Sequence, residues 1–162
     1  MTLRLILTRH AKSDWGNPAL DDKDRSLNAR GKADAPKIGA WIRSMGYEPQ
    51  EVLCSSATRT QETLRGLGYD HAPAIKVLDA LYLAEPEDIL ALLGTVQAAT
   101  VQIIAHNPGI GALANALLED EPDHPDFYRY PTGATAIIDF DQTDWNGIRA
   151  GTLVDFRVPR DL

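Results

Sequence analysis

The chain of 162 residues is 44% hydrophobic and 24% charged, which is typical of a soluble globular domain. Its net charge of −7 disfavours a broad surface for nucleic acid or acidic membranes, so an anion site has to be built locally from a few arginines. The single cysteine, Cys54, excludes an intrachain disulfide and a cysteine-based zinc cluster. Neither a membrane-spanning run nor a signal peptide is recognisable, and we therefore expect a cytoplasmic protein.

Short runs rich in branched apolar residues predict buried β-strands along the whole chain. They are residues 3–8, 51–55, 75–78, 101–105, 134–140 and 152–158. Four segments with helical spacing or helix-start signals lie between the first five of these runs. They are residues 28–44, 57–67, 86–93 and 109–118. No repeat or linker-like stretch separates them, so we expect residues 1–162 to form a single domain.

Prolines and capping residues mark the predicted helix boundaries. Pro36 lies inside the first predicted helix, which must therefore start later or kink at that point. Ser56 is expected to cap the second helix, and Pro86 suits the first turn of the third. Asn107 and Pro108 predict a cap followed by a proline at the first position of the fourth helix.

The alternation of strands and helices predicts an α/β fold with a mostly parallel sheet and helices on both faces. The last two strands follow each other without a helix, and one or both are expected to run antiparallel at an edge. Between them and the last helix, residues 119–131 carry three prolines and an acidic run at 119–126, which is typical of a solvated loop. Whether this acidic loop steers partners is left open by the sequence.

Cationic and histidine side chains follow three of the predicted parallel strands. Arg9 and His10 end the first strand, and His106 ends the strand at 101–105. Arg59 falls in the first turn of the helix that follows the strand at 51–55. Because ligands of an open parallel sheet bind outside the carboxyl ends of its strands, these side chains are expected to meet at one edge.

Two arginines and two histidines beside helix N-termini suit a phosphoryl group. A neutral imidazole can also attack phosphorus while the arginines neutralise the oxygens in the transition state. The sequence therefore predicts that Arg9 holds a phosphoryl group that His10 attacks. Taken singly, Arg59 is typical of a solvated helix residue and His106 of a structural histidine, so the prediction depends on their joint placement at strand ends.

Other motifs give weaker indications of function. The stretch from Cys54 to Arg59 is one residue too short for the C-x5-R loop of cysteine phosphatases, and Cys54 is expected to pack in a strand. Residues 109–114 match a G-x-G-x-x-A pattern, but they come late in the chain and lack the acidic residue of a dinucleotide site. The scattered histidines show no metal-binding spacing, and the three tryptophans are expected to be packing residues.

Five blocks of sequence, in order along most of the chain, carry a resemblance to a known family. They are residues 9–13 with Trp15 (RHAKS), 24–31 (DRSLNARG), 55–63 (SSATRTQET), 106–109 (HNPG) and 131–134 (PTGA). With these blocks the chain resembles the histidine phosphatase superfamily, the phosphoglycerate mutase-like group, and within it the short SixA-like phosphohistidine phosphatases. The resemblance implies a three-layer α/β/α sandwich. It also implies a reaction that needs neither a metal nor an organic cofactor.

The resemblance also implies roles for individual residues. His10 would be the nucleophile that becomes phosphorylated, while Arg9, Arg59 and His106 would bind the phosphoryl group. Asn17 is a candidate phosphate contact, although Gly16 separates it from Trp15, which relatives follow directly with asparagine. A second departure is Ala11, where the family usually has glycine.

A general acid is the remaining role that the resemblance implies. Many members protonate the leaving group with a carboxylate from the middle of the chain, and by chain order Glu85 is the candidate here. Glu85 is equally compatible with an exposed position near a helix start, where the helix dipole favours an acid.

Chain length and leaving-group chemistry favour one substrate class. With 162 residues there is little material for a lid, so an open cleft can admit a phosphorylated protein side chain. The imidazole released from phosphohistidine has a pKa of about 6.5 and leaves far more easily than an alkoxide. We therefore expect a phosphatase for phosphohistidine on a protein. The alternatives are a phosphatase of a small phosphorylated metabolite and a non-catalytic phosphoryl-binding module; the physiological substrate and the oligomeric state are not readable.

Overall fold

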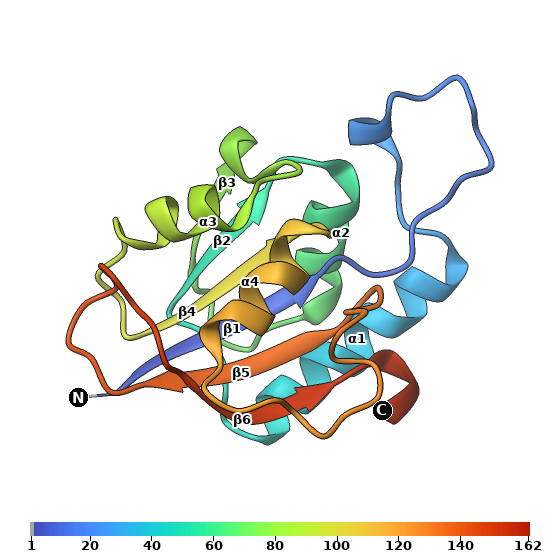
Figure 1. The fold of residues 1–162 in the computed structure, drawn as a ribbon. Helices are drawn as coiled ribbons and strands as arrows, with labels where there is room; N and C mark the ends of the chain where they lie inside the picture. The colour runs from blue at the N-terminus through green and yellow to red at the C-terminus, as the bar shows by residue number, and fades with distance from the viewer. Residues whose placement is uncertain (1) are drawn as a thin grey trace.

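A six-stranded mixed sheet forms the centre of the molecule in the computed structural model, which describes residues 2–162 (Figure 1). The strands lie in the order β3-β2-β4-β1-β5-β6. Their bounds are β1 Leu3–Arg9, β2 Glu51–Ser55, β3 Ala74–Leu78, β4 Thr100–Ala105, β5 Thr135–Phe140 and β6 Thr152–Arg157. The first four strands in chain order pair in parallel, whereas β5 runs antiparallel to both β1 and β6.

This topology confirms the expected α/β sandwich with a mostly parallel sheet. The reversed strand, β5, is the second from the edge, because the turn-rich residues 141–151 return the chain to pair β6 outside it. A hairpin-like pair therefore closes the sheet beyond β1, while the carboxyl ends of β1, β2 and β4 point to a common edge.

Two helices cover each face of the sheet (Figure 1). Their bounds are α1 Ala29–Ser44, α2 Thr58–Leu67, α3 Pro86–Leu93 and α4 Gly109–Leu117. The α1 and α2 face buries a cluster around Ile38, Ile42 and Leu67, and the α3 and α4 face buries a larger cluster around Ile89 and Leu113. On each face, the apolar sides of two helices and the branched strand residues that face them are removed from water. This burial is the main driving force for the architecture.

Helix α1 begins at Ala29 and continues through Pro36 without interruption, so the prediction of a later start is wrong. The side chain of Asn28 accepts a hydrogen bond from the Gly31 amide and fixes the N-terminus. Pro36 is exposed, and water can therefore satisfy the carbonyl group that the missing proline N–H leaves free.

The starts of α2 and α4 differ in detail from the sequence prediction. Helix α2 begins at Thr58 after Ala57, and Ser56 does not cap it. Pro108 immediately precedes α4 instead of occupying its first turn, while the Asn107 side chain accepts a hydrogen bond from the Gly111 amide as a cap does. Gly109 allows this helix start to approach the chain at Ala84, because a Cβ at that glycine would lie 1.8 Å from the Ala84 carbonyl oxygen.

A long connection between β1 and α1 projects beyond the body of the fold (Figure 1). It contains a 3₁₀ helix at Asp22–Asp24, and further 3₁₀ helices occur at Asp79–Leu81 and Pro159–Asp161. Within residues 2–162, no helix is both long and apolar enough to cross a membrane.

Candidate active site

The carboxyl ends of β1, β2 and β4 open onto a cavity of about 190 Å³, which we call the histidine cavity. The structure brings Arg9, His10, Arg59 and His106 together in its lining. The full lining is Arg9, His10, Lys12, Ser13, Trp15, Arg25, Arg59, Leu83, His106, Asn107 and Thr132. The charged residues in this lining are all cationic.

His10 is held at this cavity by backbone and ring hydrogen bonds. Its amide donates to the Ala105 carbonyl of β4, and its own carbonyl accepts from the Gly133 amide. Its ring Nδ1 lies 2.7 Å from the Ala11 carbonyl oxygen. Because a carbonyl can only accept, Nδ1 carries the hydrogen, and the second ring nitrogen, Nε2, keeps a lone pair.

The environment of His10 keeps its ring neutral. Only 5% of the residue is exposed. Burial, followed by the nearby His106, Arg9 and Arg59, lowers the pKa of His10 to about 3, against the opposing effect of its bond to Ala11. At neutral pH the ring is therefore an uncharged base, the protonation state that a nucleophilic imidazole requires.

His106 faces His10 with ring centroids 5.4 Å apart. Its Nε2 lies 2.7 Å from the Ser55 hydroxyl, and its Nδ1 lies 3.4 Å from Arg59 Nη2. Since a guanidinium only donates, Nδ1 is the acceptor and Nε2 donates to Ser55. Burial and the charge of Arg59 lower the pKa of His106 to about 4, which makes it a second neutral imidazole.

Arg59, which is buried, and Arg9, which is half-buried, supply positive charge to the cavity. Arg9 donates from Nη1 to the Tyr130 carbonyl at 3.2 Å, and its pKa is lowered by burial and by the neighbouring Arg59. The Nε atoms of both arginines are buried and have no hydrogen-bond partner within residues 2–162. Two guanidinium groups whose buried Nε donors lack a partner form a site that an anion with several oxygens can satisfy.

A carboxylate, Asp22, orients two of the arginines. Its Oδ2 accepts from Arg59 Nη2 at 2.9 Å, its Oδ1 accepts from Arg25 Nη2 at 2.9 Å, and the Tyr82 hydroxyl also donates to it. Burial alone raises the pKa of Asp22, but these hydrogen bonds outweigh burial and lower it. Asp22 therefore stays ionised and holds Arg59 and Arg25 in place.

Arg25 and Trp15 also line the histidine cavity, although the sequence predicted neither as a site residue. Arg25 is buried, donates to the Ser13 hydroxyl at 2.7 Å and lies with its guanidinium 3.5 Å from the centre of the Trp15 ring. Trp15 is 72% exposed, so its prediction as a packing residue is wrong, whereas Trp41 and Trp145 are buried as expected. Arg25 belongs to the quoted block at 24–31, which was the available signal.

Glu85 and Asn17 do not contact the histidine cavity. Glu85 is exposed at the start of α3, where it precedes Pro86, and it is absent from the cavity lining. Asn17 is exposed on the long connection, and its side chain accepts from the Ala19 amide. The structure thus leaves the site with cationic groups and neutral imidazoles, and without a carboxylic acid in its lining.

Cys54 is a packing residue and not a candidate nucleophile. Cys54 is fully buried in β2, and burial raises the pKa of its thiol to about 12, as expected for a packing residue. No three His, Cys, Asp or Glu side chains within residues 2–162 are grouped so that they could hold a metal ion.

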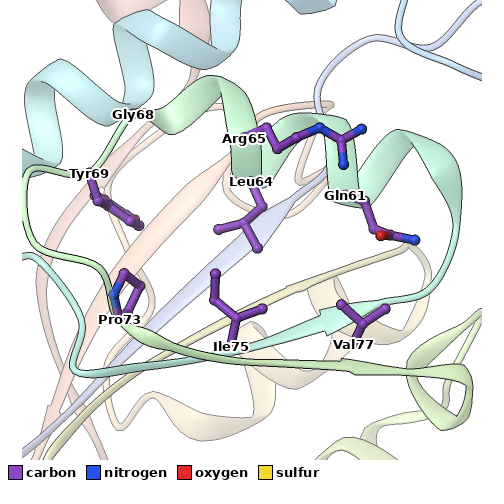
Figure 2. Close-up of a pocket in the computed structure, with 8 residues that line it drawn as sticks. All are labelled: Gln61, Leu64, Arg65, Gly68, Tyr69, Pro73, Ile75 and Val77. Atoms are coloured by element: carbon purple, nitrogen blue, oxygen red, sulfur yellow. The ribbon is translucent and has the colours of Figure 1, made fainter.

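A larger hollow lies elsewhere, between α2 and the edge strand β3 (Figure 2). Leu64 of α2 and Ile75 and Val77 of β3 make it apolar, as Figure 2 shows. It shares no lining residue with the histidine cavity. Its volume of about 390 Å³ is therefore no sign of catalysis, and the histidine cavity is the candidate active site.

The fold and this site fit one class of protein: an α/β enzyme whose histidines and arginines gather at the carboxyl ends of a mostly parallel sheet. The family model of the histidine phosphatase superfamily (branch 1) matches residues 5–82. An uncharacterized protein of Mycobacterium leprae is 32% identical over 163 residues, which cover 94% of this chain and 99% of the relative. An uncharacterized chloroplastic protein of Arabidopsis thaliana is 35% identical over 127 residues; the match covers 70% of this chain but 58% of the plant protein.

Solved structures show the same relationship. A protein named as a candidate phosphohistidine phosphatase SixA from Nakamurella multipartitia superposes with a TM-score of 0.84 at 26% identity, over 98% of this chain and 97% of that one. A SixA candidate from Agrobacterium tumefaciens gives a TM-score of 0.82 at 28% identity, over 97% and 98%. The chain belongs to the histidine phosphatase superfamily, in its SixA-like branch, and it is a phosphatase.

Proposed function

We propose that this phosphatase removes the phosphoryl group from phosphohistidine on a protein, with His10 as the nucleophile. The observation that carries the proposal is the neutral ring of His10. Its Nδ1–H donates a hydrogen bond to the Ala11 carbonyl, and its Nε2 keeps a lone pair. Arg9, Arg59 and His106 line the same cavity and are assigned to the phosphoryl oxygens. The SixA names of the similar structures support this substrate class.

In the first step, Nε2 of His10 attacks phosphorus and forms a P–N bond. The bond from phosphorus to the substrate imidazole breaks, and its electron pair returns to that ring nitrogen. The departing imidazole leaves as a neutral ring because its other nitrogen carries a proton. Arg9 and Arg59 stabilise the negative charge on the phosphoryl oxygens from fixed positions, so little reorganisation is needed at the moment of reaction.

In the second step, water attacks the phosphorus of phosphorylated His10. The P–Nε2 bond breaks and its electron pair restores the neutral His10 ring, while the oxygen and both protons of the water go to the inorganic phosphate. The Nδ1 bond to Ala11 holds the ring orientation through both steps, since it does not involve the reacting nitrogen. The balance requires water alone as co-reactant.

The cavity lining supports phosphohistidine as the substrate. It contains no carboxylic acid that could protonate an alkoxide leaving group, and Glu85 is exposed outside it. An imidazole with a pKa of about 6.5 leaves without that assistance, whereas an alkoxide, far more basic, does not. We therefore assign no catalytic role to Glu85 or Asn17, and we keep the expectation of a cytoplasmic enzyme that needs no added cofactor.

The alternative substrate is a small phosphorylated metabolite, which the volume of the histidine cavity also admits. Turnover of N-acetyl-phosphohistidine amide against a panel of sugar and nucleotide phosphates separates the two. The proposal predicts that kcat/KM for the phosphohistidine compound exceeds every alkyl phosphate by at least about 100-fold, because only alkoxide departure requires an acid. Equal or better turnover of one alkyl phosphate would overturn the assignment, and phosphate retained without release would indicate a binding module.

A further inference from the structure

A second groove adjoins the histidine cavity. It has a volume of about 390 Å³, runs along the first two turns of α4, and shares Asn107 with the histidine cavity. Its remaining lining is Pro108, Gly111, Ala112, Asn115, Tyr128 and Arg129. We call this feature the α4 groove. The α4 groove therefore adds space directly beside the histidine cavity.

The lining of the α4 groove includes two exposed residues of types that are common in protein interfaces. Tyr128 is 86% exposed, and tyrosine and arginine are enriched where proteins bind one another. Arg129 is also exposed and reaches Asp126 at 3.2 Å. The lining contains no carboxylate, although the chain as a whole carries a net charge of −7. The groove is therefore a local surface on which a polypeptide can lie without strong charge repulsion.

Hydrogen bonds connect the two walls of the groove to the catalytic residues. Asn107 Nδ2 donates to the carbonyls of Arg129 and Tyr130, and Asn107 Oδ1 accepts from the Gly111 amide of α4. The Tyr130 carbonyl also accepts from Arg9 Nη1. The groove is thus pre-organised relative to the phosphoryl-binding arginine, which lowers the entropic cost of binding a chain segment across both.

We propose that the α4 groove binds the polypeptide segment that flanks the phosphohistidine of a protein substrate. This inference rests on the proposed function, because it places the flanking chain of that substrate beside His10. Asn107 marks the junction between the two subsites, with the phosphorylated ring on one side and the flanking residues on the other. Tyr128 is the exposed aromatic anchor of the flanking segment.

The test compares two substrates with the same leaving group. One is N-acetyl-phosphohistidine amide, and the other is a pool of peptides with a central phosphohistidine and degenerate flanks. Wild-type enzyme is expected to use the pool with the higher kcat/KM. Ala112→Arg, at an exposed helical position in the groove, is expected to lower the ratio of the two kcat/KM values by about tenfold, because the side chain occupies the subsite.

Ala116→Arg is the matched control, since it adds the same side chain to an exposed position of α4 outside the groove lining. It is expected to leave the ratio at the wild-type value, and Tyr128→Ala to lower it by about threefold. An equal ratio in both arginine variants, or no preference of the wild type for the pool, overturns the inference and leaves the phosphatase intact. Failure of the wild type on both substrates overturns the proposed function and, with it, the inference.

Discussion

Replacing His10 with asparagine tests the physical basis of the nucleophile through the pH dependence of stability. Folding lowers the pKa of His10 to about 3, whereas an unfolded chain has a histidine pKa of about 6.5. As the pH falls below 6.5, His10 binds a proton in the unfolded state but stays unprotonated in the folded state. The free energy of unfolding therefore falls with pH throughout the window from 6.5 to about 3.

The size of the effect follows from the width of that window. Each pH unit within it costs about 1.4 kcal/mol for one fully shifted group, so His10 alone removes about 2 kcal/mol between pH 6.5 and 5.0. His106, whose pKa is lowered to about 4, contributes a similar loss over the same interval. The His10→Asn variant is thus expected to lose about half as much stability as the wild type on acidification to pH 5.0.

Urea unfolding followed by tryptophan fluorescence at several pH values between 7.5 and 5.0 measures this difference. Asparagine suits the experiment because it is polar and its amide can still donate to the Ala11 carbonyl. His71→Asn, which removes an exposed ring, is the matched control and is expected to keep the wild-type pH dependence. Identical pH dependence in His10→Asn and wild type would show that His10 is protonated as readily in the folded protein, and would refute the neutral nucleophile.

Three further substitutions test the arginines and the packing beside the site. Arg59→Lys removes a guanidinium group that donates to both the carbonyl and the carboxylate of Asp22. The kcat/KM for phosphohistidine is expected to fall about 100-fold. A loss under fivefold would contradict the role of Arg59. Asp22→Asn leaves the guanidinium groups of Arg59 and Arg25 without a counter-charge, and urea unfolding should show about 1 kcal/mol less stability, a modest value because Asp22 is partly exposed. Gly109→Ala places a Cβ 1.8 Å from the Ala84 carbonyl oxygen and should cost about 2 kcal/mol or more in the same assay; unchanged stability in either variant would contradict the stated contact.

The parallel sheet and the positions of four site residues were predictable from the sequence. Branched apolar runs that alternate with helices allow few arrangements other than a parallel sheet, and such a sheet gathers its carboxyl strand ends at one edge. Arg9, His10 and His106 sit directly at strand ends, and Arg59 in the first turn of the following helix. These four residues therefore line one cavity because of the sheet topology, and the pattern of strands and helices in the sequence is enough to predict that topology.

The contacts of Arg25 and Asp22 were not predictable from the pattern of strands and helices, because both residues lie on the long connection before α1. No periodic pattern defines the path of that connection, and it is held by side-chain contacts that depend on the folded site, such as Arg25 with Trp15 and Asp22 with Arg59. The exposure of Trp15 has the same origin: its ring covers a guanidinium at the cavity instead of filling the core.

The start of α2 was mispredicted for a different reason. Ser56 is a residue that favours caps, but in the structure the hydroxyl of the preceding Ser55 accepts from the Ala57 amide and from His106. The polar group at this helix start is thus used to orient a site histidine. Local propensity gives way here to a contact between segments far apart in sequence.

The central claim is that the phosphoryl group passes through His10, and trapping the phosphorylated enzyme tests it most directly. Wild type and His10→Ala are mixed with N-acetyl-phosphohistidine amide, quenched in alkali within milliseconds to seconds, digested and analysed by mass spectrometry. We expect phosphate on the wild-type peptide containing His10, appearing before or with free phosphate, and neither label nor phosphate release in His10→Ala. Phosphate release by wild type without that label, together with undiminished release by His10→Ala, would contradict the account.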